Sequence, residues 1–315
     1  MPKQPAFLMR SIRLGTGIAV LLLSMLACNL PFAGAPQSTA QPQAVQIPTQ
    51  NPAAPDASEI PQPAATASPT ATALPMATAQ PTSIPPTPTT SLLSAQYNGV
   101  SLSFDPSLAG QVVGKTVPEV TDQTGAPWEI APQSIQFDFN SYLLPSTYNQ
   151  PALIIYPVAG YKSANDAVAP IITSLQTLLK TKPANPSQPL PFLPTWNAAQ
   201  IFHSNVAYLK FKNGEGVRFL AEYGQDIFPV NNRMLIYIFQ GLTQDGKYYI
   251  SLVLPVNNSI LPADEKIPES DNGAFTANFN NYLKDTQTKL SAQPSSSFKP
   301  DLSLLDAMVQ SLSVQ

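Results

Sequence analysis

Between residues 95 and 315, apolar residues recur with the two periods that distinguish strands from helices. Strict alternation over 99–104 and 134–139 predicts half-buried strands, and a second short strand is expected at 111–113. Residues 152–156 form a continuous apolar run, which is typical of a strand covered on both faces.

The middle of this region predicts two hairpins. Segments 206–211 and 217–223 flank a turn at 213–216, and segments 234–241 and 247–254 flank a turn around Asp245 and Gly246. Four strands in succession predict an antiparallel sheet.

Helical spacing appears on either side of the hairpins. Residues 163–180 are expected to form a helix that Ser163 or Asn165 caps, and Pro170 is expected to kink it rather than to mark its start. A second helix would carry an apolar stripe made of Phe275, Phe279, Tyr282, Leu283 and Leu290.

Asp301 is the expected N-cap of a last helix. Its apolar stripe would comprise Leu304, Leu305, Met308 and Leu312, and residues 311–314 are expected to run extended. The elements together predict an α+β fold in which an antiparallel sheet packs against helices as an α/β/α sandwich, in a single domain spanning 95–315.

Two short stretches of this domain, YNGVSLSFDP at 97–106 and LLDAMVQSL at 304–312, are similar to the ends of Mog1/PsbP-like domains. The resemblance implies an antiparallel sheet between helices and a binding or accessory role. It brings no catalytic residue with it.

Residues 1–27 have the organisation of a bacterial secretory signal. Lys3, Arg10 and Arg13 precede an apolar run at 14–26, which is shorter than the roughly 20 residues that span a bilayer.

Ala27 comes directly before Cys28, the only cysteine of the chain, in an arrangement that resembles the lipobox of bacterial lipoproteins. Met25 and Leu26 depart from the lipobox pattern. The resemblance implies cleavage after residue 27, acylation of Cys28 and a lipid anchor on the extracytoplasmic face of the cell membrane. The alternative is an ordinary signal peptide followed by a chance cysteine.

Residues 28–94 differ in composition from everything that follows. Pro, Thr, Ala, Gln and Ser dominate, and Asp56 and Glu59 are the only charged residues. A segment with so little apolar surface is expected to be a disordered, partly extended spacer between the lipid anchor and the domain.

Charge limits the classes of partner. The chain carries 16 basic and 19 acidic residues, and losing 1–27 removes three basic residues and no acidic one. Because no basic run lies outside the signal, nucleic-acid binding is disfavoured. A surface rich in amides and hydroxyls suits envelope proteins or neutral glycans.

Candidate chemistry is sparse. His203 is the only histidine, so a multi-histidine metal site is excluded; it could serve a hydrolase, but a partly exposed strand residue is the simpler interpretation. The S-x-x-K match at 296–299 has no companion motifs, and we treat it as chance. Carboxylates between Asp264 and Asp271 suit a solvated acidic loop better than a calcium site. No cofactor is expected.

Arg218 and Glu222 share one face of a predicted strand. One interpretation is a ligand platform anchored by Arg218, with Tyr223 and Gln240 nearby; the other is an ion pair on a solvated face.

Three hypotheses of function follow. The domain is expected to be a non-catalytic binding or accessory module at the cell surface. The alternatives are a cell-envelope hydrolase that uses His203 or a carboxylate pair, and a purely structural envelope protein.

Overall fold

The computed structural model describes residues 91–315, except 123, 125, 145–147, 187–188 and 268–270. These residues belong to the second of two units into which the chain divides, Met1–Gln80 and Pro81–Gln315. The predicted signal peptide, Cys28 and almost all of the predicted linker lie outside the described residues.

The domain is α+β and is built around one seven-stranded sheet in the order β3-β4-β5-β9-β8-β7-β6. Every neighbouring pair in it is antiparallel. Its strands are β3 (Gln111–Val117), β4 (Ser134–Asn140), β5 (Ala152–Pro157), β6 (Ala199–Phe211), β7 (Gly214–Gly224), β8 (Ile236–Thr243) and β9 (Tyr248–Pro255).

Two smaller sheets accompany it. The first, in the order β1-β2-β12, joins β1 (Leu93–Tyr97), β2 (Val100–Phe104) and β12 (Ser313–Val314); the second pairs β10 (Asn257–Asn258) with β11 (Phe298–Lys299). Asn98 and Gly99 connect β1 to β2 with φ angles of 43° and 78°, the left-handed conformation that a tight hairpin turn requires.

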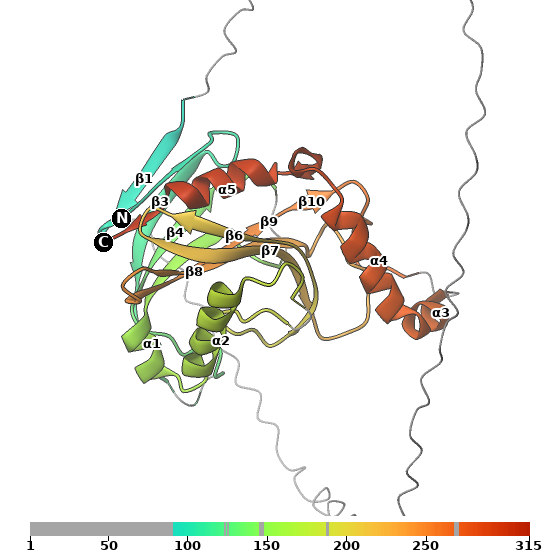
Figure 1. The fold of residues 1–315 in the computed structure, drawn as a ribbon, viewed down its shortest axis with the longest axis horizontal. Helices are drawn as coiled ribbons and strands as arrows, with labels where there is room; N and C mark the ends of the chain where they lie inside the picture. The colour runs from blue at the N-terminus through green and yellow to red at the C-terminus, as the bar shows by residue number, and fades with distance from the viewer. Residues whose placement is uncertain (1–90, 123, 125, 145–147, 187–188, 268–270) are drawn as a thin grey trace, which may run out of the picture. The chain divides into compact units, whose positions relative to one another are not determined.

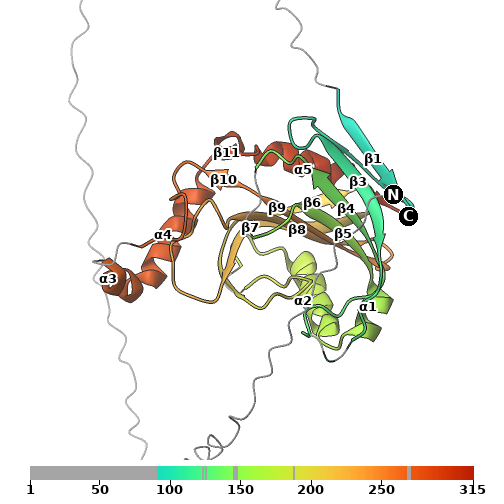
Figure 2. The same ribbon diagram turned by 180° about the vertical axis from the view of Figure 1, so that it is seen from behind.

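Helices cover both faces of the large sheet (Figures 1 and 2). The helices are α1 (Val158–Ala164), α2 (Val168–Thr181), α3 (Asn272–Ala277), α4 (Phe279–Ser291) and α5 (Leu302–Ser311), with a 3-10 turn at Ser295–Ser297. None of the helices from residue 91 onwards, gaps aside, is long and apolar enough to cross a bilayer.

Each face of the sheet has its own apolar core. On the α2 side, Ile172 and Leu175 pack with Phe219 of β7 and other sheet residues. On the α5 side, Leu305 and Met308 pack with residues that include Phe239 of β8, and the β1-β2-β12 sheet closes this core. The sheet is therefore the middle layer of the domain.

A close approach seals the small sheet onto the large one. A Cβ added to Gly114 of β3 would lie 2.2 Å from Cβ of Tyr97, so only glycine lets β1 pack against β3. The Tyr97 hydroxyl is hydrogen-bonded to Thr116 at 3.0 Å.

The predicted strands are confirmed and most extend further than expected, while β1 lies ahead of them at the edge of the predicted linker. The prediction of one helix over 163–180 with a cap at Ser163 or Asn165 and a kink at Pro170 is wrong: residues 165–167 separate two helices, the N-cap of α2 is Ala167, and Pro170 is the third residue of α2. Proline fits there without a kink because N–H groups of the first turn have no partner within a helix. Asp301 caps α5 as expected, accepting the backbone N–H of Ser303.

Candidate functional site

The four residues proposed as a ligand platform lie on opposite faces of the large sheet. Arg218 and Glu222 share one face, as predicted, and point towards the α5 side. Tyr223 of β7 and Gln240 of β8 contact groups of the α2 side. The structure therefore does not bring the four together.

Arg218 is a buried structural residue. Its guanidinium donates from Nε to Oδ1 and from Nη2 to Oδ2 of Asp306 in α5, at 3.1 and 2.9 Å, and also bonds the carbonyl of Asn205. The Tyr237 hydroxyl donates to Oδ1 of the same carboxylate at 2.8 Å. The interpretation as an ion pair on a solvated face is wrong, because Arg218 is only 8% exposed and its partner comes from a helix that covers the sheet.

Glu222 is completely buried. Its two carboxylate oxygens accept the backbone N–H and the side-chain amide of Asn231, at 3.0 and 3.2 Å. Burial raises the pKa of Glu222 to about 8, even though the Asn231 backbone bond acts in the opposite direction. Glu222 is thus a structural carboxyl rather than an exposed contact.

Tyr223 and Gln240 hold the segment that leads from α2 to β6. Gln240 bonds the Pro191 carbonyl through Nε2 and accepts the Tyr249 hydroxyl at 3.1 Å. The Tyr223 hydroxyl accepts from Gln200 at 2.7 Å. Gln200 in turn accepts the N–H of Leu190 at 2.9 Å, so these contacts hold Leu190 and Pro191 on the sheet.

Among the described residues, His203 and the carboxylates of the acidic loop form no constellation for catalysis or metal binding, and Glu269 of that loop lies outside the described residues. Nε2 of His203 lies 3.0 Å from the carbonyl oxygen of Pro186, and no ion pair links this ring to a carboxylate among the described residues. Asp264 pairs with Lys266 and Glu265 with Arg233, each at 3.0 Å. Within residues 91–315, outside the gaps, no group of three His, Cys, Asp or Glu could hold a metal ion.

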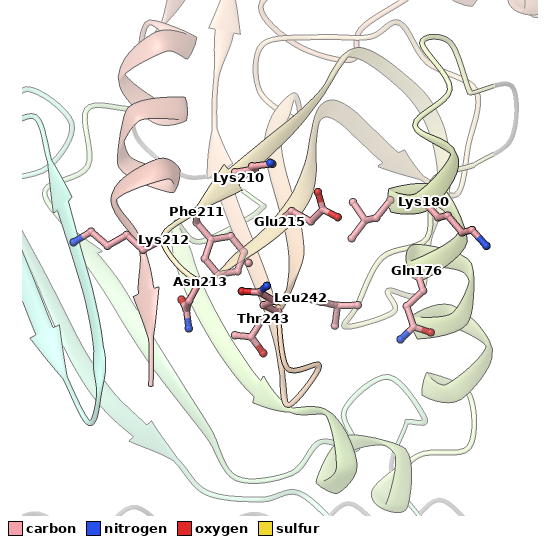
Figure 3. A pocket seen from close by; sticks show the side chains of 12 residues that line it. Gln176, Lys180, Lys210, Phe211, Lys212, Asn213, Glu215, Leu242 and Thr243 are labelled. Atoms are coloured by element: carbon pink, nitrogen blue, oxygen red, sulfur yellow. The ribbon is translucent and has the colours of Figure 1, made fainter.

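A groove of about 650 Å³ opens between the C-terminal part of α2 and the hairpin turns that join β6 to β7 and β8 to β9 (Figure 3). We call it the lysine groove. Its lining residues are Gln176, Leu179, Lys180, Lys210, Phe211, Lys212, Asn213, Gly214, Glu215, Leu242, Thr243 and Gln244.

The apolar wall of the groove, the Phe211 ring, has room only because residue 214 is a glycine. The Phe211 ring meets Phe239 edge-on at 6.2 Å, and a Cβ added to Gly214 would lie 2.1 Å from that ring. Asn213 fastens the turn to β12, since its Oδ1 accepts the N–H of Val314 at 3.1 Å and its Nδ2 bonds the carbonyl of the same residue.

Positive charge gathers at the rim of the lysine groove. Figure 3 shows Lys180 and Lys212 extending outwards at opposite ends, with Lys210 and Glu215 between them. Glu215 pairs with Lys182 at 2.7 Å, whereas Lys180, Lys210 and Lys212 form no ion pair with the described part of the chain. Three lysines and one carboxylate thus line the groove, although the whole protein has more acidic than basic residues.

The groove has the chemistry of a binding site. Its side chains offer ammonium groups and amides around an apolar wall, and no histidine or cysteine lines it among the described residues. The sequence does hold a signal for it that was overlooked: the Lys-x-Lys pairs 180/182 and 210/212, at the end of a helix and beside a hairpin turn.

Comparison with known proteins adds no relative: no family model matches the chain, and no significant match to it was found among curated proteins or solved structures.

Proposed function

We propose that this protein is a lipid-anchored, extracytoplasmic binding module whose lysine groove takes an acidic ligand. The signal-like residues 1–27, the lipobox-like Cys28 and the spacer composition of 28–94 support the location. The resemblance to Mog1/PsbP-like domains favours a binding or accessory role over a catalytic one.

The observation that carries the ligand class is the charge of the groove. Three rim lysines without an ion-pair partner in the described chain would attract carboxylate or phosphate groups, and attraction at an exposed rim acts over roughly 10 Å at moderate ionic strength. The Phe211 wall and the amides of Gln176 and Asn213 would contact the uncharged parts of the same ligand.

Titration of the whole chain, purified in detergent, with a fluorescently labelled oligogalacturonate tests the proposal. We expect saturable binding that weakens as salt is added. The combined variant Lys180→Gln, Lys210→Gln and Lys212→Gln should weaken it about tenfold, because rim charges contribute through long-range attraction. An oligophosphate of equal charge, run in parallel, distinguishes phosphate from carboxylate ligands.

The matched control removes three lysines elsewhere, through Lys284→Gln, Lys289→Gln and Lys299→Gln, all of which are exposed. The control should bind as the wild type does. An equal loss of affinity in both triple variants would show that binding depends only on the net charge of the protein, and would contradict the groove as the site. An absence of saturable binding to both probes would refute the proposal.

A further inference from the structure

A second hollow, of about 240 Å³, lies on the α2 side of the large sheet over β5 and β9. We call it the aromatic pocket. Its floor consists of two cross-strand pairs, Ala152 with Val253 and Ile154 with Ser251. Because Ala152 and Ser251 have small side chains, the floor is recessed there.

Two aromatic side chains form the walls of the aromatic pocket together with Pro194. Tyr148, ahead of β5, is 53% exposed, and the Arg233 guanidinium lies 4.9 Å from the centre of its ring. Trp196, in the segment between α2 and β6, is half-buried and packs edge-on against Tyr223, with ring centres 4.4 Å apart. Both rings are thus supported by neighbours.

The segment that carries Trp196 is held in place by hydrogen bonds to β8 and β9. The Leu193 N–H donates to the Tyr249 hydroxyl at 3.0 Å, and Gln240 bonds the carbonyl of Pro191. Phe192 packs against the Trp196 ring with centres 5.1 Å apart. A ligand would therefore meet a wall that is already ordered, which lowers the entropy cost of binding.

The chemistry of the lining indicates an uncharged ligand. No Lys, Arg, Asp or Glu lines the aromatic pocket among the described residues. Asn149 and Gln150 contribute amides, which can both donate and accept hydrogen bonds, and Ser251 contributes a hydroxyl. A sugar ring presents C–H groups that pack on aromatic rings and hydroxyls that bond amides.

We propose that the aromatic pocket binds one neutral sugar unit of a glycan. This inference goes beyond the acidic ligand of the lysine groove and does not depend on it. Within it, Trp196 and Tyr148 contact the sugar, while Gln240 and Tyr223 are positioning residues that hold the Trp196 wall.

Calorimetric titration of the whole chain in detergent with cellohexaose, maltohexaose and chitohexaose, all neutral, provides the test. We expect at least one to bind saturably and without dependence on salt. Tyr148→Ala should weaken that binding at least tenfold and should leave folding intact, because Tyr148 is an exposed side chain outside the two cores. Trp196→Ala should weaken it as much or more.

A spectroscopic control locates the binding. In a Trp128→Phe background, Trp196 is the only remaining tryptophan, so the neutral sugar should change its fluorescence. The triple lysine variant of the groove should bind the neutral sugar normally, which separates the two proposals. Absence of binding to all three hexasaccharides, or binding that survives both Tyr148→Ala and Trp196→Ala, would overturn the inference.

Discussion

Arg218 shows how a charged residue comes to lie in the interior of this domain. Its guanidinium is satisfied by Asp306, which follows it by 88 residues, and by a carbonyl at the β-bulge of β6. Removing one member of such a pair leaves the other buried and uncompensated, which costs far more than the pair contributes.

Asp306→Ala should therefore lower the free energy of unfolding by about 3 kcal/mol, because it leaves the Tyr237 hydroxyl without its acceptor and the Arg218 guanidinium with only the Asn205 carbonyl. Urea denaturation of both forms measures the difference. Asp138→Ala is the matched control: its pair with Lys115 is exposed, so the cost should stay below about 1 kcal/mol. Equal costs for the two variants would contradict this account of Arg218.

Glu222 should make stability depend on pH. Its pKa is about 8 in the folded chain, against an ordinary value of 4.5, so between these values the folded state holds a proton that the unfolded state has released. The stability of the wild type relative to Glu222→Gln should fall as pH rises from 4.5 to 8, by at most roughly 1.4 kcal/mol per pH unit, and then level off.

Chemical denaturation of both proteins between pH 5 and 9 checks this slope. Asp245→Asn is a useful control, because hydrogen bonds from Thr243 and Lys247 lower the pKa of Asp245 to about 2, outside that range. Its difference from wild type should stay constant from pH 5 to 9. A constant difference for Glu222→Gln as well would show that the carboxyl is ionised in its buried site.

Single residues were the hardest feature to predict. Alternation placed Arg218 and Glu222 on one face of β7 correctly, but it could not show that α5 covers that face. Alternation within one strand also says nothing about which faces of neighbouring strands coincide. Gln240 was therefore expected beside Arg218. The register instead pairs Gln240 with Val217, on the face of the sheet opposite to the Arg218–Asp306 contact. The lysine groove was missed because its lysines come from a helix, the end of a strand and a turn, which only the folded chain brings together.

Among the elements, those with strict apolar periodicity were predicted best. β2, β4, β5 and the two hairpins follow the sequence pattern, and α5 begins at its predicted cap. β1 was missed although Asn98-Gly99 is a hairpin signal, because its own residues, LSAQY, show only one buried position. The first half of β6 was missed for a different reason: several of its residues are half-buried on both faces of the strand, so apolar and polar residues do not alternate there.

The short strand β12 depends on one side chain of a distant turn. Asn213→Ala would leave both the N–H and the carbonyl of Val314 without their partner. We expect a loss of about 1–2 kcal/mol in the free energy of unfolding, and faster hydrogen exchange at the backbone of 313–315.

Hydrogen exchange followed by mass spectrometry measures the effect at the C-terminal peptide. Asn281→Ala, which removes an exposed amide bonded only to Asn278 among the described residues, should change neither quantity appreciably. Unchanged exchange in Asn213→Ala would mean that pairing with β2 alone holds β12.

At the scale of the whole domain, one sheet separates two apolar cores. The aromatic pocket lies on the α2 side of this sheet, and the lysine groove lies between α2 and the hairpin turns at one end of the sheet. Of the two sites, only the lysine groove is tied to the small sheet in the described part of the chain, through Asn213 and Val314 of β12. The proposed location rests on the sequence alone, through Cys28.

Metabolic labelling with an alkyne-bearing fatty acid tests the anchor. Wild type should incorporate the label and Cys28→Ser should not, because no other cysteine exists to carry it. Met25→Leu, which moves the sequence towards the lipobox pattern, should keep the label. Incorporation that persists in Cys28→Ser would exclude acylation at this residue.

The attachment of β1 also determines how the domain bears mechanical load. Any tension in the chain before Leu93 enters through this strand, which pairs with β2 over five residue pairs. The connecting turn, Asn98 and Gly99, lies at the opposite end of β1 from Leu93. A force along the strand therefore loads all of the β1–β2 hydrogen bonds in shear and does not break them one after another. With the Tyr97 side chain packed over Gly114 and β12 paired with the other edge of β2, β1 would detach under such a load only when many contacts break together.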